Sequence, residues 1–256
     1  MRINAILLSA VFLCFACGNS FAYINATYLN TTVILNATTT AHVIETVTIN
    51  MSNSSVAQYL QDRQAINLTL SDWASTLHTN LLIQHILSPN SSVGRFTLLP
   101  GPLLYSNSRT AQATLTMSYI DYNITSITNI GPRRFEYIFN GGSLNFEHTA
   151  GGQSLPPDAR LNIIVPKGTE IVSVYPQPDF PPPSFLGSYN NDTLLSWYEG
   201  EPLHKFQFSY IVKQSLQNEV ITYFSTMYDN YKQEIYLFLI ILVSIMSVYI
   251  YVRVFT

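Results

Sequence analysis

Cysteine is almost missing from this chain of 256 residues. The two that occur, Cys14 and Cys17, both lie in an apolar N-terminal stretch. If that stretch is removed on export, the remaining chain has no thiol. A secreted domain of this kind must be stabilised by its hydrophobic core and not by disulfides.

Charged residues are also scarce. They make up 11% of the chain, against about 25% in a typical soluble domain, so the polar surface must come from Ser, Thr, Asn and Tyr. The formal net charge of −3 provides no basic field for nucleic acid, and we expect no nucleic-acid partner. With 47% hydrophobic and 13% aromatic residues, the chain can build a core, which disordered proteins cannot.

Motifs of known catalytic and metal sites are missing as well. The chain has no G-x-S-x-G, H-E-x-x-H, Gly-rich phosphate loop or EF-hand loop. His78 and His85 lie in a predicted helix about 10.5 Å apart, too far to share one metal ion. His42 and Glu45 are three apart in a predicted strand and so point to opposite faces. We therefore predict no catalytic, cofactor-binding or metal-binding residue, although a triad assembled only in three dimensions stays open.

The N-terminus has the parts of an export signal. Arg2 provides a positive charge, residues 6–16 are apolar, and the residues up to Ala22 match a signal-peptidase site. We predict a signal peptide over residues 1–22. The alternative is an uncleaved first transmembrane helix, for which the apolar run is short.

The C-terminal end is apolar. Residues 235–252 contain no charged side chain, and as a helix they would span about 27 Å, close to the hydrocarbon thickness of a bilayer. Tyr236 and Tyr249 suit the two membrane interfaces, and Arg253 suits a cytoplasmic anchor. We predict a single-pass cell-membrane protein with its ectodomain outside and a short cytoplasmic tail at 253–256.

Acceptor motifs for N-glycosylation support an exported ectodomain. Nine occur between the two apolar ends, where chance predicts roughly four from the Asn, Ser and Thr content. They are Asn25, Asn30, Asn36, Asn50, Asn53, Asn67, Asn90, Asn123 and Asn191. Most lie early in the chain, so we expect residues 130–216 to form the barer surface for a partner.

The first half of the ectodomain mixes strand and helix patterns. β-Branched residues without Pro or Gly predict a strand over 40–49. A helix is predicted over 71–87, because Ser71 can cap it and apolar residues recur at spacing four from Trp73 onward. Alternating apolar residues predict another strand over 111–120.

Past residue 129, Gly and Pro pairs occur about every ten residues, which is typical of a sandwich or barrel. Strands are predicted over 133–139, 161–165, 170–175, 193–198 and 204–213. In the last of them Phe206, Phe208 and Tyr210 alternate toward a core.

Taken together, these patterns predict a mainly β fold. We expect one or two β-sandwich-like domains with one inserted helix near 71–87, plus a C-terminal juxtamembrane and transmembrane helix. The predicted units are a signal peptide (1–22), a first β-rich glycosylated domain (23–129), a second β-sandwich-like domain (130–215), a helical stalk (216–234), a transmembrane helix (235–252) and a tail (253–256).

A proline-rich segment, residues 176–183, predicts a stiff, extended loop. Phe180 and Phe185 are either exposed there as anchors for a partner or packed on the sheet as part of a connection. The apolar face of the stalk offers a similar choice, between packing beneath the last domain and self-association or contact with a membrane partner.

Four segments of the second half combine turn and strand residues. They are Gly131-Pro132-Arg133-Arg134, Leu155-Pro156-Pro157-Asp158-Ala159-Arg160-Leu161, Ile171-Val172-Ser173-Val174-Tyr175-Pro176 and Leu195-Ser196-Trp197. On these segments the stretch 120–212 resembles uncharacterised archaeal exported proteins with a β-rich ectodomain and a C-terminal transmembrane anchor. The resemblance implies a similar plan and no known activity.

We therefore expect a membrane-anchored, N-glycosylated extracellular protein with a structural or interaction role. It would serve in the cell envelope or as an accessory subunit of a membrane complex, with its partner on residues 130–234. One alternative is a receptor-like module that binds a solute or glycan, which requires a concave aromatic pocket. The other is an exported hydrolase, which requires polar groups that converge in a cleft.

Overall fold

The computed structural model describes residues 22–65, 68–89, 93–149, 152–181 and 194–255. Within these ranges, side chains are described except at residues 149, 218, 219, 222 and 248–255. Both cysteines and all of the predicted signal peptide except Ala22 lie outside the described residues.

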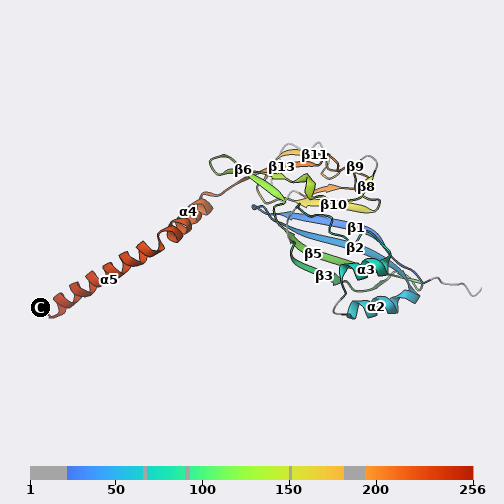
Figure 1. Ribbon diagram of the computed structural model, residues 1–256, viewed down its shortest axis with the longest axis horizontal. Helices are drawn as coiled ribbons and strands as arrows, with labels where there is room; N and C mark the ends of the chain where they lie inside the picture. Colours follow the sequence, from blue (N-terminus) through green and yellow to red (C-terminus); the bar gives the residue numbers. More distant parts are fainter. Residues whose placement is uncertain (1–21, 66–67, 90–92, 150–151, 182–193, 256) are drawn as a thin grey trace, which may run out of the picture.

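Three long strands form the centre of the molecule (Figure 1). They are β1 (Ile24–Leu35), β2 (Ala41–Ser52) and β5 (Thr110–Asp121), each 12 residues long. In β2 and β5, odd-numbered residues are buried and most even-numbered ones are half-buried. This period of two gives the sheet one core face and one outer face. The strands predicted over 40–49 and 111–120 are thereby confirmed, whereas β1 was not predicted.

The large sheet has the strand order β12-β10-β1-β2-β5-β3, and β4 also pairs with β5. Its shorter strands are β3 (Gly94–Pro100), β4 (Leu104–Tyr105), β10 (Ala159–Ile164) and β12 (Leu194–Trp197). β10 runs parallel to β1, while the other neighbours are antiparallel. Strands from 23–129 and from 130–215 therefore share one sheet.

A second sheet has the order β11-β13-β7-β6. Its strands are β6 (Thr125–Gly131), β7 (Arg134–Phe139), β11 (Glu170–Tyr175) and β13 (Gln207–Lys213), with a two-stranded ribbon of β8 (His148–Thr149) and β9 (Gly152–Gln153) nearby. The predicted strands of the second half match β7, β10, β11 and β12 within two residues. The last one begins at Gln207 and not at His204.

Aromatic side chains fill the core. Trp197 of β12 meets Phe206 edge to face with ring centroids 5.2 Å apart, and Tyr137 stacks on Tyr210 at 5.1 Å. These residues belong to one cluster with the apolar odd-numbered residues of β2 and β5. The second sheet therefore covers the core face of the large sheet, and the mainly β prediction is confirmed.

Two helices also join this core. They are α2 (Val56–Gln64), which follows the short 3-10 turn η1 (Asn53–Ser55), and α3 (Leu70–Leu77). Tyr59 of α2 and Trp73 of α3 are buried with ring centroids 5.7 Å apart. In Figure 1 both helices lie across the lower part of the large sheet. A second short 3-10 turn, η2 (Gly141–Ser143), follows β7.

The predicted helix over 71–87 was wrong in extent. Thr69 caps α3: its hydroxyl accepts a hydrogen bond from the Asp72 N–H, and the Asp72 carboxylate accepts one from the Thr69 N–H. The helix stops at Leu77, because His78 adopts a left-handed conformation with φ 47°. Residues 79–88 continue as an irregular segment.

The chain ends in two helices that extend away from the sheets, α4 (Leu216–Asn230) and α5 (Lys232–Phe255) (Figure 1). The predicted stalk is helical apart from an interruption at Tyr231. Among the described residues, no helix meets the length and apolarity needed to cross a membrane.

Candidate functional site

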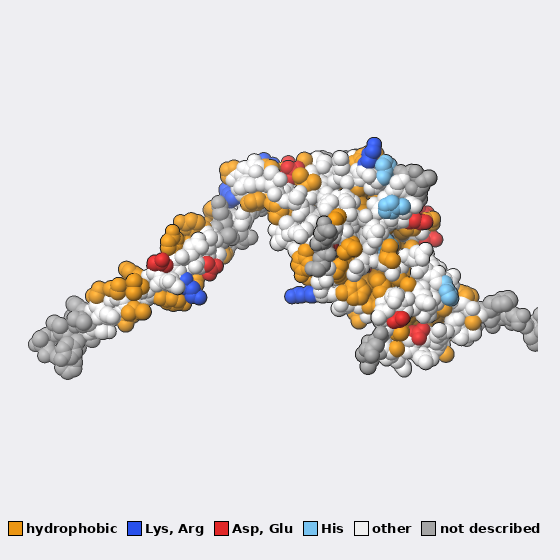
Figure 2. All heavy atoms as spheres, in the orientation of Figure 1, with side chains coloured by type: hydrophobic (Ala, Val, Ile, Leu, Met, Phe, Trp, Pro, Cys, Tyr) orange, Lys and Arg blue, Asp and Glu red, His pale blue; other side chains and the backbone are white. Residues whose placement is uncertain are grey.

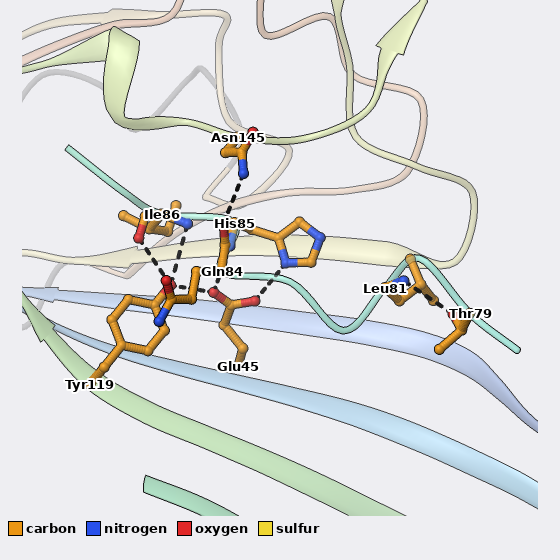
Figure 3. Close-up of polar contacts among 8 residues, drawn as sticks. All are labelled: Glu45, Thr79, Leu81, Gln84, His85, Ile86, Tyr119 and Asn145. Atoms are coloured by element: carbon orange, nitrogen blue, oxygen red, sulfur yellow. Dashed lines mark hydrogen bonds and ion pairs between the residues drawn. The ribbon is translucent and has the colours of Figure 1, made fainter. Parts of the chain in front are cut away.

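Acid and base groups converge where residues 79–88 cross the core face of the large sheet (Figure 3). Glu45 comes from β2 and Tyr119 from β5, and both occupy odd positions on that face. Tyr119 lies opposite Val43, two residues from Glu45, so the two side chains are diagonal neighbours. His85 reaches them from the irregular segment. We call Glu45, His85 and Tyr119 the buried polar cluster.

Both carboxylate oxygens of Glu45 are occupied. His85 Nδ1 lies 2.6 Å from Oε2, and the His85 backbone N–H donates to Oε1 at 2.9 Å. The Tyr119 hydroxyl also donates to Oε1 and accepts from the Ile86 N–H at 3.3 Å. The Glu45 carboxylate therefore provides hydrogen-bond partners both for the backbone N–H and for the side chain of His85 in the irregular segment.

The protonation of Tyr119 follows from its surroundings. Burial raises the pKa of the Tyr119 phenol far above its ordinary value, and the Glu45 carboxylate raises it further. The phenol thus stays neutral and keeps the proton that it donates. On the other side of the cluster the His85 ring stacks on Phe146, with ring centroids 5.0 Å apart.

A second buried carboxylate holds the end of the same segment. Asp121 Oδ2 accepts from the Ser88 N–H at 2.9 Å and from the Ser88 hydroxyl at 2.8 Å. Ser88 Oγ also lies 3.0 Å from Ser143 Oγ. Buried polar groups need such partners, and here two acids provide them for an irregular stretch that runs through the core.

This arrangement suits a structural role better than catalysis. Glu45, Tyr119 and Asp121 are fully buried and His85 is 2% exposed. A catalytic base must reach a substrate atom, and a carboxylate that already accepts three hydrogen bonds within a sealed core does not. Among the described residues, no three His, Cys, Asp or Glu side chains are grouped to hold a metal ion.

The remaining histidines lie apart from the cluster. His42 Nε2 lies 2.7 Å from Ser118 Oγ on the outer face of the large sheet, on the side opposite to Glu45. His148 and His204 both line a shallow pocket of about 640 Å³, together with Gly152 and Lys205. Sequence spacing did not predict this pocket, because the two histidines come from segments 56 residues apart.

The predicted glycosylation sites occupy two kinds of position. Asn25, Asn30 and Asn50 lie in strands of the large sheet, Asn36, Asn53 and Asn123 lie in exposed turns or strand ends, and Asn67, Asn90 and Asn191 lie outside the described residues. The sheet register places the first three on the outer face, since their sequence neighbours contact the core.

The proline-rich loop lies along the edge of β12. The Ser196 N–H donates to the Phe180 carbonyl at 2.8 Å, the Phe180 N–H donates to the Ser196 carbonyl at 3.2 Å, and the Trp197 indole donates to the Pro176 carbonyl at 3.0 Å. The loop thus covers a sheet edge, while the Phe180 side chain is 49% exposed. Phe185 lies outside the described residues.

A second pocket lies near the point where the chain leaves the sheets. It has a volume of about 460 Å³ and is lined by apolar side chains of β6, β7 and β13, among them Ile127, Phe135 and Val212. Tyr137 and Lys213 also line it. Its lining is mostly apolar and includes two aromatic rings.

No protein-family model and no curated protein matches this chain. The resemblance to archaeal exported proteins stays a prediction.

Proposed function

We propose that this protein is a membrane-anchored, N-glycosylated ectodomain that acts by binding or by building the cell envelope, not by catalysis. One observation carries the proposal: helix α5 presents large apolar side chains on all sides. Leu237, Phe238 and Ile240 are each more than 60% exposed. Figure 2 shows hydrophobic side chains along this arm, away from the sheets.

Exposed apolar surface of this kind needs an explanation. A helix that is apolar all round belongs in a protein core or in a lipid bilayer. The described part of α5 does not by itself meet the length and apolarity of a membrane span. In the sequence, however, the uncharged run covers Ile235 to Val252, and as a helix it would span about 27 Å, close to the hydrocarbon thickness of a bilayer. A lipid bilayer is the environment that supports this surface best.

The buried polar cluster favours a binding or envelope role over an exported hydrolase. Its acid and base groups hold residues 79–88 in place and have no access to solvent. The partner of the ectodomain, an envelope or membrane protein, would contact the second half of the chain or the stalk.

Membrane extraction tests the anchor. The full chain is expressed with a C-terminal tag, and membranes are washed with alkaline carbonate. The variant Leu239→Arg with Val243→Arg places two charges one turn apart in α5, each costing roughly 3 kcal/mol at a bilayer centre. The matched control, Val220→Arg with Phe224→Arg, places two charges at the same spacing in α4.

We expect the native chain and the α4 control to stay in the washed membranes, and the α5 variant to be released. Protease added from outside should digest the ectodomain and spare the tag. Release of the native chain by carbonate would contradict the anchor, and digestion of the tag would contradict the orientation.

A further inference from the structure

We infer that the outer face of the large sheet is a glycan-bearing face, and that Asn25 and Asn50 are alternative acceptors on it. A folded molecule carries a glycan on one of these two residues and not on both. The inference rests on the proposed export and glycosylation, and it adds which sites exclude each other.

The sheet register places the acceptors on the outer face. Asn25 is flanked by Ile24 and Ala26, which contact the core. Because side chains alternate along a strand, the Asn25 side chain points away from that core. Asn50 lies directly opposite Asn25 in the β1–β2 pair and shares its face.

The composition of this face suits a sugar covering. In β1, β2 and β5 it carries no Asp, Glu, Lys or Arg, and rows of hydroxyl and amide groups cross it. In one row Asn30 lies beside Thr46, which lies beside Thr116. The other neighbour of Asn30 is Arg160 of β10, the one charged residue in this row, which donates to Ser196 Oγ and lies over the Tyr198 ring. In the next, Thr48 lies beside Thr114. Such groups form hydrogen bonds with sugar hydroxyls without the cost of covering a charge.

Hydrogen bonds on this face leave the modified atom available. An N-glycan is attached to the side-chain nitrogen of Asn. Asn50 uses its oxygen, which accepts from Gln112 Nε2 at 3.2 Å. Asn30 likewise accepts from Asn162 Nδ2 at 2.7 Å through its oxygen. In neither residue does Nδ2 donate to another described residue, so glycosylation of either one would break no hydrogen bond of the described part.

The short distance between Asn25 and Asn50 prevents both residues from carrying a glycan in the same folded molecule. Residues directly opposite in an antiparallel pair have Cβ atoms roughly 5 Å apart. Each glycan is bulky and must leave the sheet along the same outward direction. Two of them would occupy one volume, so a doubly modified chain would have to separate β1 from β2 at this end. Asn30 pairs with Thr46, four residues from Asn50 along β2, so it lies about 13 Å from this pair and is compatible with either site.

A single tryptic peptide shows whether Asn25 and Asn50 carry glycans on the same molecule. No Lys or Arg lies between Ala22 and Arg63, so residues 23–63 leave the protein as a single peptide that contains both sites. We expect electron-transfer mass spectrometry of the glycosylated full-length protein to find this peptide with sugar on Asn25 or on Asn50. It should not find both on one peptide.

Two variants and a control sharpen the result. Asn25→Gln should raise the occupancy of Asn50, and Asn50→Gln should raise that of Asn25, each by up to about twofold if the sites compete evenly. Asn36→Gln, in the turn between β1 and β2, should change neither. Peptides with both sugars at the frequency given by the product of the single occupancies would overturn the exclusion.

The outcomes separate this inference from the function that it rests on. Glycans on Asn36 or Asn53, with none on Asn25, Asn30 or Asn50, would overturn the glycan-bearing face and leave export intact. A protein from its own host without any glycan would overturn both.

Discussion

Glu45 and His85 are 40 residues apart in the chain, yet the Nδ1 of His85 lies 2.6 Å from the Oε2 of Glu45 in the core. The contact fastens an irregular segment to the middle of a sheet. That segment, residues 79–88, follows helix α3 in the chain and lies across the core face of the large sheet. The buried polar cluster is therefore a determinant of stability.

Replacing Glu45 should show how much the buried polar cluster contributes to the free energy of unfolding. Glu45→Gln keeps the shape but removes the charge that accepts from His85, Tyr119 and the backbone. Loss of one partner of a buried charged network costs about 3 kcal/mol. Denaturant unfolding of the detergent-purified chain measures this loss.

A surface ion pair provides the control. Glu170 Oε2 lies 3.3 Å from Arg134 Nη2, and both side chains are largely exposed. Glu170→Gln should cost less than about 1 kcal/mol. Equal losses of unfolding free energy for Glu45→Gln and Glu170→Gln would show that the buried polar cluster contributes no more to stability than a surface ion pair.

Alkaline pH should destabilise the fold through its buried phenols. Burial raises the pKa of Tyr119 and of Tyr210 above the ordinary value of 10.0. The resulting stability is fully present below pH 10.0, and it is lost as the pH rises above that value, because the unfolded chain releases protons that the native state keeps.

Unfolding free energies measured at several pH values test this prediction. Tyr210→Phe should flatten the decline above pH 10.0, since one buried phenol is gone. Tyr175→Phe, at a position that is half exposed, serves as the control for removing a phenol outside the core. A stability that stays constant through this range would contradict the raised pKa of the two buried phenols.

Two glycines should differ sharply in their tolerance of a methyl group. A Cβ at Gly141 would lie 2.6 Å from the Phe206 backbone oxygen, and backbone cannot move aside cheaply. Gly141→Ala should therefore cost about 1–3 kcal/mol. At Gly131 a Cβ meets nothing within 4 Å, so Gly131→Ala should change stability by less than about 0.5 kcal/mol. Thermal or denaturant unfolding of the two variants gives the comparison.

The stability that the N-terminal cap of α3 contributes should decrease at low pH. Hydrogen bonds from the Thr69 hydroxyl and backbone lower the pKa of Asp72 below its ordinary value of 3.8. The stability that this carboxylate contributes is present above pH 3.8 and is lost as the pH falls through the lower native pKa. Asp72→Asn should therefore be less stable than the native chain at neutral pH, and the difference should shrink in strong acid. If the difference in unfolding free energy between Asp72→Asn and the native chain did not vary with pH, the charged carboxylate would not be what stabilises the cap.

Much of the strand structure was predictable from the sequence, because a strand in a half-buried sheet repeats every two residues. The alternation from Ala113 to Tyr119 predicted β5 and its core face correctly. The alternation from Phe206 to Tyr210 correctly placed Phe208 and Tyr210 in the core, but β13 begins only at Gln207, and Ser209 and Ile211 are buried too. Spacing also placed His42 and Glu45 on opposite faces of β2.

The extent of the first helical region was decided by tertiary contacts. Apolar residues recur at spacing four from Trp73 to Leu81, which predicts a helix that runs on. The helix instead stops at Leu77, where His78 turns left-handed, and the segment beyond it is held by two buried acids, Glu45 and Asp121. Those acids lie in other strands, and nothing local marks them as partners of this segment.

The sequence by itself determined the apolar ends, the acceptor motifs and the two-residue period of strands such as β5, since all of these depend on neighbours in the chain. Only the tertiary structure decided that β10 joins β1, that Glu45 meets His85, and that Asn25 lies opposite Asn50. These relationships depend on which distant segments bury their apolar faces together. That choice minimises the exposed area of the whole chain, and local pattern does not encode it.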